Sequence, residues 1–395
     1  MSLIGLDYYL IQKIDELLDY DYDTRLTLRN VCQCWNKCLP PITIDSILLK
    51  EIITLPYVRI AEIALTSGWQ KLLTYAIKCG FCNWNIGLQW ACQGGHVSSI
   101  QMMIDHGADD WNQGLYGACY GGHQDPVQMM IDRGADDLNQ GLSGACRGGQ
   151  LEMVRILIDR GANKWDQCLF EACYGGHPVL AQMMIDLGAT EWNTGLYGAC
   201  CGGHLDLAQK MVERGATDWN HALGGACYGG HLSLIDRLLQ YGADDWNGGL
   251  YGACIGGHLS LVQMMIDHGA NDWDIGLKGA CCGGHQLLVQ VMLDLGATKM
   301  HWGLQGACEG GCVATTQMMI QKCDAKKLSF VFLLACMEGH LAVVQLLIKH
   351  GVTDWNRGLN CACRKHHTSL IRLMIQQGAT QCNFCGRTAQ EHQTM

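Results

Sequence analysis

The chain has 395 residues, of which 49% are hydrophobic and 16% charged, so it is long and apolar enough to bury a large core. Its formal net charge of -10 at pH 7 argues against a nucleic-acid partner, which would require a clustered basic surface. Every apolar stretch falls short of the roughly 18 residues of a membrane helix, and the first residues lack the pattern of a secretory signal. We therefore expect a cytoplasmic protein with protein partners and no membrane contact.

The N-terminal segment 1–40 differs from the rest because it lacks periodic glycines. Its apolar residues fall at helical spacing before and after an acidic break, "DYDYD" at 19–23. This segment resembles an F-box, and "RLTLRNVCQCW" at 25–35 is similar to the pattern of Leu, Val-Cys and Trp that closes that family's motif. Asp7 stands where the family usually has Pro.

The resemblance implies that the segment docks by apolar contacts to a Skp-type adaptor of a cullin-RING ubiquitin ligase. The alternative is a helical hairpin that caps the repeats, and residues 41–56 would then be a linker or part of that cap. The residues that would contact the adaptor are Leu6, Leu10, Ile14, Leu17, Val31 and Trp35.

Beyond residue 56 the sequence is repetitive. Cysteine recurs every 27 residues from Cys92 to Cys308, and again at 336 and 363 after one inserted residue. We divide 84–381 into eleven repeats, with 57–83 as a degenerate capping repeat and 382–395 as a tail. The repeats begin at 84, 111, 138, 165, 192, 219, 246, 273, 300, 328 and 355.

Each repeat predicts two short helices, as the repeat at 111–137 illustrates. Asn112 is a candidate N-cap of the first helix, and the second helix ends at Gly134. Helices of about ten residues are marginal alone, so neighbouring repeats must bury each other's apolar faces. Gly114 and Gly117 each cost the first helix up to about 1 kcal/mol, which we explain by close approach of stacked helices. The predicted fold is an all-α solenoid of stacked helix-turn-helix repeats.

The repeats resemble the ankyrin repeat, for example in "EGHLAVVQLLIKHGVTDWN" at 338–356. The family's usual repeat has about 33 residues and carries T-P-L-H before its first helix, whereas these repeats have 27 and read "WNxGLxGAC". The missing residues correspond to the projecting β-hairpin finger, so binding should use the first helices and the short loops. Such shortened, near-identical arrays are similar to those that giant DNA viruses of amoebae encode, which would place the protein in the host cell cytoplasm.

Two positions of the first helix vary from repeat to repeat, at 116 and 120 and their equivalents at 27-residue spacing. Positions shared by all repeats serve stacking, so we expect recognition where the repeats differ. Tyr and Arg are favoured at protein interfaces. Random substitution at exposed positions would also give different residue types in different repeats. The candidates for the target-binding face are Tyr116, Tyr120, Arg147, Phe170, Tyr174, Tyr197, Tyr228 and Tyr251.

The recurring cysteines and histidines, such as Cys119 and His123, are residue types that bind metal ions, so a metal site must be considered. Packed helices lie about 8–10 Å apart, whereas zinc needs four ligands at about 2.0–2.3 Å. We therefore expect reduced, buried thiols, histidines that hydrogen-bond the backbone, and no metal or cofactor. Nearly every polar residue belongs to a periodic row, so no catalytic site is expected.

Two functions remain open. In the first, the chain is a substrate receptor that links a captured target to a host cullin-RING ubiquitin ligase through its F-box-like segment. In the second, it is an ankyrin-repeat binding protein that masks a host partner without a ubiquitin link. In either case its role is binding rather than catalysis.

Overall fold

A computed structural model provides the structure of the chain. The F-box-like segment 1–40, with its six adaptor-contact candidates, and the linker at 41–56 lie outside the residues that it describes. The described residues form two compact units, one ending at Thr190 and the other beginning at Glu191. The structure describes residues 57–78, 81, 83–323, 328–364, 367–384 and 386.

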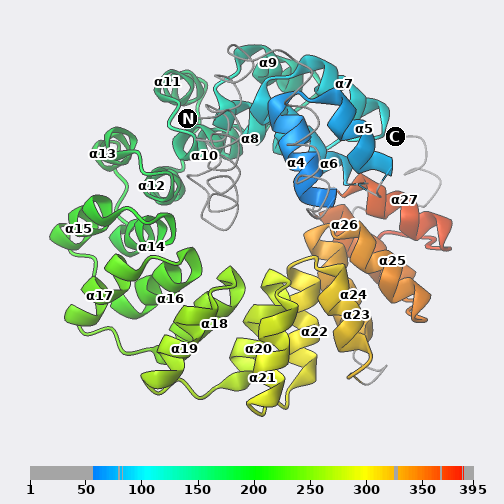
Figure 1. Cartoon of the computed structure of the whole chain (residues 1–395). Coiled ribbons are helices and arrows are strands. Elements are labelled where there is room, and N and C mark those ends of the chain that lie inside the picture. Colours follow the sequence, from blue (N-terminus) through cyan, green and yellow to red (C-terminus); the bar gives the residue numbers. More distant parts are fainter. Residues whose placement is uncertain are drawn as a thin grey trace, which may run out of the picture. The chain divides into compact units, whose positions relative to one another are not determined.

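The fold is all-α, as predicted, and successive helices pair into helix-turn-helix repeats (Figure 1). Between residue 57 and the first of the eleven repeats lie α4 (Tyr57–Ser67) and α5 (Gln70–Lys78). We call the first helix of each repeat helix one and the second helix two. Helix one of the successive repeats is α6 (Trp84–Gly94), α8 (Trp111–Gly121), α10 (Leu138–Arg147), α12 (Trp165–Tyr174), α14 (Trp192–Gly202), α16 (Trp219–Gly229), α18 (Trp246–Gly256), α20 (Trp273–Gly283), α22 (Met300–Glu309), α24 (Leu328–Glu338) and α26 (Trp355–Arg364). Helix two is α7 (Val97–Asp105), α9 (Gln124–Asp132), α11 (Leu151–Asp159), α13 (Pro178–Asp186), α15 (Leu205–Glu213), α17 (Leu232–Gln240), α19 (Leu259–Asp267), α21 (Gln286–Asp294), α23 (Val313–Ile320), α25 (Leu341–Lys349) and α27 (Thr368–Gln376).

The start of helix one corrects one prediction. Asp110, not Asn112, is the N-cap of α8, because the Asp110 side chain accepts a hydrogen bond from the backbone N–H of Gln113. Asn112 lies inside the helix, and its Oδ1 accepts from the backbone N–H groups of Asp136 at 2.9 Å and Asp137 at 3.0 Å. Asn112 therefore fixes the loop that leads to the next repeat.

Helix one packs against helix one of the neighbouring repeats through small residues, as predicted. Leu115, Ala118 and Cys119 of α8 are fully buried. A Cβ added at Gly117 would overlap the backbone oxygen of Gln89 in the preceding repeat, which leaves room only for glycine. We call this side of helix one, with its shared Gly, Leu, Ala and Cys positions, the stacking surface.

Histidines in the turn between the two helices also join repeats, which confirms the prediction that they bond the backbone. The Nε2 of His231 lies 3.1 Å from the carbonyl oxygen of Cys201, and the Nε2 of His285 lies 3.0 Å from that of Ile255. A carbonyl oxygen can only accept, so Nε2 carries the proton. Gln150 replaces the histidine in one repeat and donates from its Nε2 to the carbonyl oxygen of Tyr120 at 3.3 Å.

An aromatic contact holds the two helices of one repeat together. The indole of Trp219, at the start of helix one, stacks on Tyr241 after helix two with ring centroids 4.9 Å apart. In the next repeat Trp246 stacks on His268 at 4.7 Å. Such contacts add to apolar burial because the rings also attract each other electrostatically.

The recurring cysteines lie in the core as free thiols. Burial raises the pKa of the Cys119 and Cys227 thiols to about 12. The thiol form therefore predominates at neutral pH, and these residues act as small apolar groups. Within the described ranges, none of the helices combines the length and apolarity needed to cross a membrane.

Candidate functional site: the helix-one face

The predicted target-binding residues all lie on helix one, at the positions that vary between repeats. Within each compact unit the helix-one segments lie along one side of the stack and the helix-two segments along the other (Figure 1). We call the variable side of helix one, at position 116, position 120 and their equivalents, the helix-one face. All eight candidates are half-buried except Tyr228, which is 39% exposed.

In the first unit the structure brings three of the candidates together. The guanidinium of Arg147 lies over the ring of Tyr174 at 4.0 Å, and the ring of Phe170 lies 6.1 Å from that of Tyr174. Arg147 also forms an ion pair with Glu171, with 3.6 Å between Nη1 and Oε2. Burial raises the pKa of the Glu171 carboxyl, and the charge of Arg147 opposes that rise.

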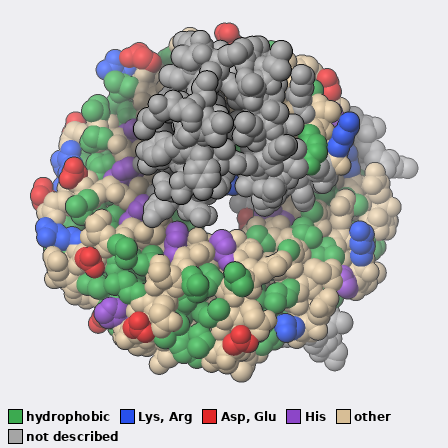
Figure 2. Space-filling view, viewed as in Figure 1, with side chains coloured by type: hydrophobic (Ala, Val, Ile, Leu, Met, Phe, Trp, Pro, Cys, Tyr) green, Lys and Arg blue, Asp and Glu red, His purple; other side chains and the backbone are tan. Residues whose placement is uncertain are grey.

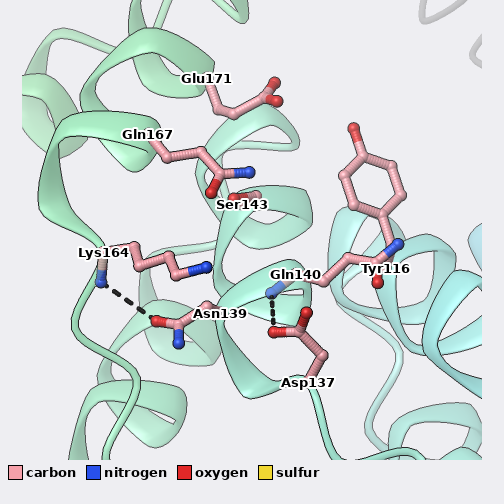
Figure 3. A pocket seen from close by; sticks show the side chains of 8 residues that line it. All are labelled: Tyr116, Asp137, Asn139, Gln140, Ser143, Lys164, Gln167 and Glu171. Atoms are coloured by element: carbon pink, nitrogen blue, oxygen red, sulfur yellow. Dashed lines mark hydrogen bonds between the residues drawn. The ribbon is translucent and has the colours of Figure 1, made fainter. Parts of the chain in front are cut away.

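A pocket of about 310 Å³ opens on this face between α10 and α12. Ser143 stands in a row where the neighbouring repeats carry Tyr116 and Phe170, so a small side chain replaces an aromatic ring. Figure 3 shows Ser143 in the middle of the pocket, with Glu171 toward one end and Asp137 toward the other. The pocket therefore lies beside a position where the neighbouring repeats carry an aromatic residue.

Two buried polar atoms of this pocket have no hydrogen-bond partner. Ser143 is 1% exposed, and its Oγ has no hydrogen-bond partner. Glu171 Oε2 is buried and accepts no hydrogen bond, since Arg147 stands 3.6 Å away. Lys164 forms no ion pair with a described residue, whereas the equivalent Lys299 pairs with Asp274 at 3.6 Å. Buried polar groups are normally satisfied, so Ser143 Oγ and Glu171 Oε2 are exceptions, whereas Lys164 is exposed to solvent.

In the second unit the same face is aromatic. The ring of Tyr197 stacks on His221 with centroids 4.0 Å apart and an angle of 8° between the planes. Burial raises the pKa of Tyr197, and nearby Cys201, Tyr228 and Tyr251 raise it further. Three predicted tyrosines of this unit therefore lie close enough to interact electrostatically.

Charge is distributed without a dominant basic region on the surface that is drawn. Figure 2 shows Lys and Arg side chains scattered among acidic ones, with hydrophobic and uncharged groups between them. Within the described residues no group of three or more His, Cys, Asp or Glu side chains is arranged to hold a metal ion. The helix-one face therefore offers aromatic contact area and hydrogen bonds, which are the means of protein recognition.

Sequence reasoning missed Ser143, Lys164 and Glu171 as members of a site. A signal for Ser143 was present, because it interrupts the row of aromatic residues at 116, 170 and 197. No comparable signal exists for Glu171, whose role depends on which side chain of the preceding repeat faces it.

Comparisons with known proteins bear on the repeat itself. The family model described as "Ankyrin repeat" matches residues 332–358. The chain carries an ankyrin repeat there. The match begins within α24, includes α25 and ends within α26.

The chain is also similar to a solved structure, the crystal structure of the human ASB11 ankyrin repeat domain. The two sequences are 22% identical, the match covers 40% of this chain and 84% of the other, and the TM-score is 0.28. No curated protein matches the chain. Ankyrin repeats are typically binding scaffolds for other proteins rather than catalysts, and the ankyrin-like solenoid described above has that architecture.

Proposed function

We propose that the chain captures a target protein on the helix-one face of its repeats. The observation that carries this proposal is the contrast within helix one between a uniform stacking surface and a varied face whose eight candidates include six tyrosines. Arg147 and Tyr174 in the first unit, and Tyr197 and Tyr228 in the second, are the anchors that we expect to contribute most. Tyr116, Tyr120, Phe170 and Tyr251 complete the proposed face.

We further propose that the F-box-like segment 1–40 recruits a Skp-type adaptor and its cullin, so that the captured target is delivered to a ubiquitin ligase. Leu6, Leu10, Ile14, Leu17, Val31 and Trp35 are the proposed contacts. In this arrangement the repeats bind the target and the F-box-like segment holds it near the ligase, while other proteins transfer ubiquitin. The alternative is a binding protein that masks its partner with no ubiquitin link.

The proposed domain plan follows the sequence: the F-box-like segment 1–40, a linker or cap at 41–56, a capping repeat at 57–83, eleven repeats at 84–381 and a tail at 382–395. Short, nearly identical repeats favour an origin in a giant DNA virus of amoebae. The host cell cytoplasm is then the proposed place of action.

A pull-down with purified adaptor tests the ubiquitin link. Full-length protein, a form lacking 1–40 and the Trp35→Ala variant are each mixed with the Skp-type adaptor and cullin. The receptor hypothesis predicts recovery of the adaptor with the full-length chain alone, and strongly reduced recovery with Trp35→Ala. Equal recovery with all three, or none with folded full-length protein, would leave the masking alternative.

Site-specific photo-crosslinking tests the helix-one face. A second surface offers a comparison, because Leu205, Leu232 and Leu259 at the start of helix two are 44%, 56% and 59% exposed. A photoreactive residue replaces Tyr228 on the face or Leu232 on helix two, and the full-length chain is illuminated in amoebal lysate. We expect a discrete crosslinked partner from position 228 and none from position 232; the reverse result would move the binding surface to helix two.

A further inference from the structure

Helix α24 is apolar on both of its sides. The side that packs against the rest of the chain carries the buried residues Leu328, Val331, Phe332, Ala335 and Cys336. The opposite side, which belongs to the helix-one face, carries apolar residues at i, i+3, i+4 and i+7, namely Phe330, Leu333, Leu334 and Met337. We call these four residues the α24 stripe. A surface helix is normally polar on the side that faces away from the core, so stacking of the repeats accounts for only one of the two apolar sides.

The α24 stripe is accessible to solvent. Phe330 is 60% exposed, and the other three residues of the stripe are half-buried. Leu334 stands at the position that Gly306 occupies in the preceding repeat. A Cβ at Gly306 would overlap the backbone oxygen of Lys278, whereas α24 accommodates a whole leucine at the equivalent position. This position therefore adds apolar area to the helix-one face of α24 instead of close backbone contact.

The edge of the stripe on α22 is aromatic. Trp302 is equivalent to Phe330 and extends the apolar surface into the preceding repeat. Glu309 lies on the same side of α22, and both of its carboxylate oxygens have partners. One lies 3.1 Å from Lys278 Nζ, and the other accepts a hydrogen bond from Gln305 Nε2 at 2.6 Å. This edge therefore presents an indole ring and a paired charge.

The edge of the stripe on α26 is basic. Arg357 is equivalent to Phe330, and Arg364 follows seven residues later on the same side of the helix. Both arginines are exposed. Arg357 pairs with Asp354 at 3.0 Å, whereas Arg364 forms no ion pair with a described residue. From residue 301 onward the sequence contains nine Lys or Arg and five Asp or Glu, although the whole chain has a net charge of -10.

The spacing and the charges together define the class of segment that fits. Apolar side chains at helical spacing over about 10 Å complement the apolar stripe of another α-helix. A strand, which presents every second side chain, matches that spacing poorly. A basic helix would face Arg357 and Arg364 and would gain only Glu338, the last residue of α24. An acidic helix instead places its carboxylates along the arginines, which is the complementary arrangement.

We propose that the α24 stripe binds an amphipathic α-helix of another protein, with the apolar side of that helix on Phe330 and Met337 and its acidic edge toward Arg364. This site goes beyond the proposed function, because none of the eight candidates for the target-binding face belongs to it. It gives the last repeats of the second unit a binding specificity of their own.

Selection from a library of randomised peptides tests the proposal on the full-length chain. The peptides have about 20 residues, which is long enough to form a helix on binding. Dissociation constants of enriched peptides are measured for the native chain, Phe330→Gln and Arg364→Glu. Two matched controls are Leu287→Gln, which removes an apolar side chain more exposed than Phe330, and Arg372→Glu, which reverses an exposed charge on α27. Melting temperatures confirm that each variant is folded.

We expect a group of enriched peptides to lose at least about tenfold in affinity for Phe330→Gln and to bind Leu287→Gln like the native chain. These peptides should carry apolar residues at helical spacing with Asp or Glu beside them, and circular dichroism should show that they become helical on binding. Arg364→Glu should weaken them about fivefold, and Lys in place of their acidic residues should reverse that preference. Arg372→Glu should leave binding unchanged.

If no enriched peptide responds to Phe330→Gln, the α24 stripe as a binding site is contradicted. Responsive peptides with alternating apolar residues, or with Lys and Arg beside the apolar ones, would overturn the acidic helix as its occupant. Sedimentation of the native chain tests a second copy as the occupant. A dimer that dissociates in Phe330→Gln would overturn the proposal in favour of self-association, whereas the same sedimentation of both forms agrees with it.

Discussion

The two sides of helix one differ in how freely their residues change. On the stacking surface, a Cβ at Gly252 would overlap the backbone oxygen of Gly224 in the preceding repeat. On the helix-one face, a Cβ at Gly224 would stand 3.5 Å from the nearest backbone oxygen, that of Gly248, in ordinary contact. The same residue type is therefore required by packing on one side and replaceable on the other.

The helix-one faces of the two compact units differ in the residues that they carry at equivalent positions. The first unit carries Ser143 and an open polar pocket, whereas the second carries Tyr197 and a stacked ring at the equivalent position. Stacking is preserved in both. Chemistry on the face can therefore change one repeat at a time while the shared positions hold the fold.

The largest predicted effect sharpens the contrast between the two sides. Gly252→Ala should lower the free energy of unfolding by about 3 kcal/mol, because the added methyl group must push two backbones apart. Gly224→Ala is the matched control and should be neutral or stabilise the helix by up to about 1 kcal/mol. Urea unfolding of both variants measures the difference, and equal destabilisation would contradict the assignment of the two surfaces.

The second prediction concerns the side chain that fixes the loop between repeats. Asn193 Oδ1 accepts from the backbone N–H groups of Thr217 at 2.8 Å and Asp218 at 3.0 Å. Asn193→Ala removes both bonds and should cost about 2 kcal/mol by urea unfolding. Asn193→Asp retains the acceptor, as the chain itself does at Asp274, and should cost much less. Similar losses from both variants would show that the acceptor is unimportant.

The third prediction tests the histidine that joins repeats. His231→Ala removes the bond from Nε2 to the Cys201 carbonyl and should cost about 1 kcal/mol. His231→Gln should recover most of this loss, because Gln150 makes the equivalent bond elsewhere in the chain. Thermal unfolding of the two variants separates them; failure of Gln to rescue would assign the effect to ring packing instead.

The stability of the chain should depend on pH through His340. Burial lowers the pKa of its imidazole from 6.5, and the hydrogen bond to the Glu309 carbonyl oxygen opposes that shift. The unfolded chain binds the proton more readily than the folded one. The contribution of His340 to stability is therefore complete above pH 6.5 and is lost as the pH falls toward the lower pKa of the folded state. Urea unfolding between pH 7.5 and about 5 should show a flatter decline for His340→Gln than for the native chain. Parallel declines would contradict the prediction.

The smallest stability effect should come from the helix-one face. Tyr228 is 39% exposed, so Tyr228→Ala should change the free energy of unfolding by about 0.5 kcal/mol or less. Its effect should appear in binding instead. A loss above about 2 kcal/mol would place Tyr228 among the residues that hold the fold.

Much of the architecture could be predicted because the repeats encode it many times. Helix one begins at Trp84, Trp111 and each later position that the 27-residue period marks up to Met300, and one residue later in the last two repeats; apolar spacing identified its buried side. The N-cap prediction at Asn112 was wrong because Asp110 and Asn112 are both suitable residue types for a cap, and the helix begins before Asn112, at Trp111.

The site was harder to predict than the fold. Comparing the repeats groups residues that occupy the same position in each repeat. The pocket, in contrast, is lined by residues from different positions of adjacent repeats. Ser143, Lys164 and Glu171 belong to three such rows. Their proximity depends on how far α12 is shifted along α10, which no periodicity within a single repeat specifies.

The central claim is that the varied face binds and the shared positions hold the fold. The most direct test measures the affinity of the crosslinked partner for two variants, each with three residues replaced. One replaces Tyr197, Tyr228 and Tyr251 with Ala on the helix-one face, and the other replaces Leu205, Leu232 and Leu259 with Ala on helix two. We predict that the tyrosine variant binds about a hundredfold more weakly while the leucine variant binds like the native chain. Native affinity of the tyrosine variant, with loss in the leucine variant, would contradict the claim.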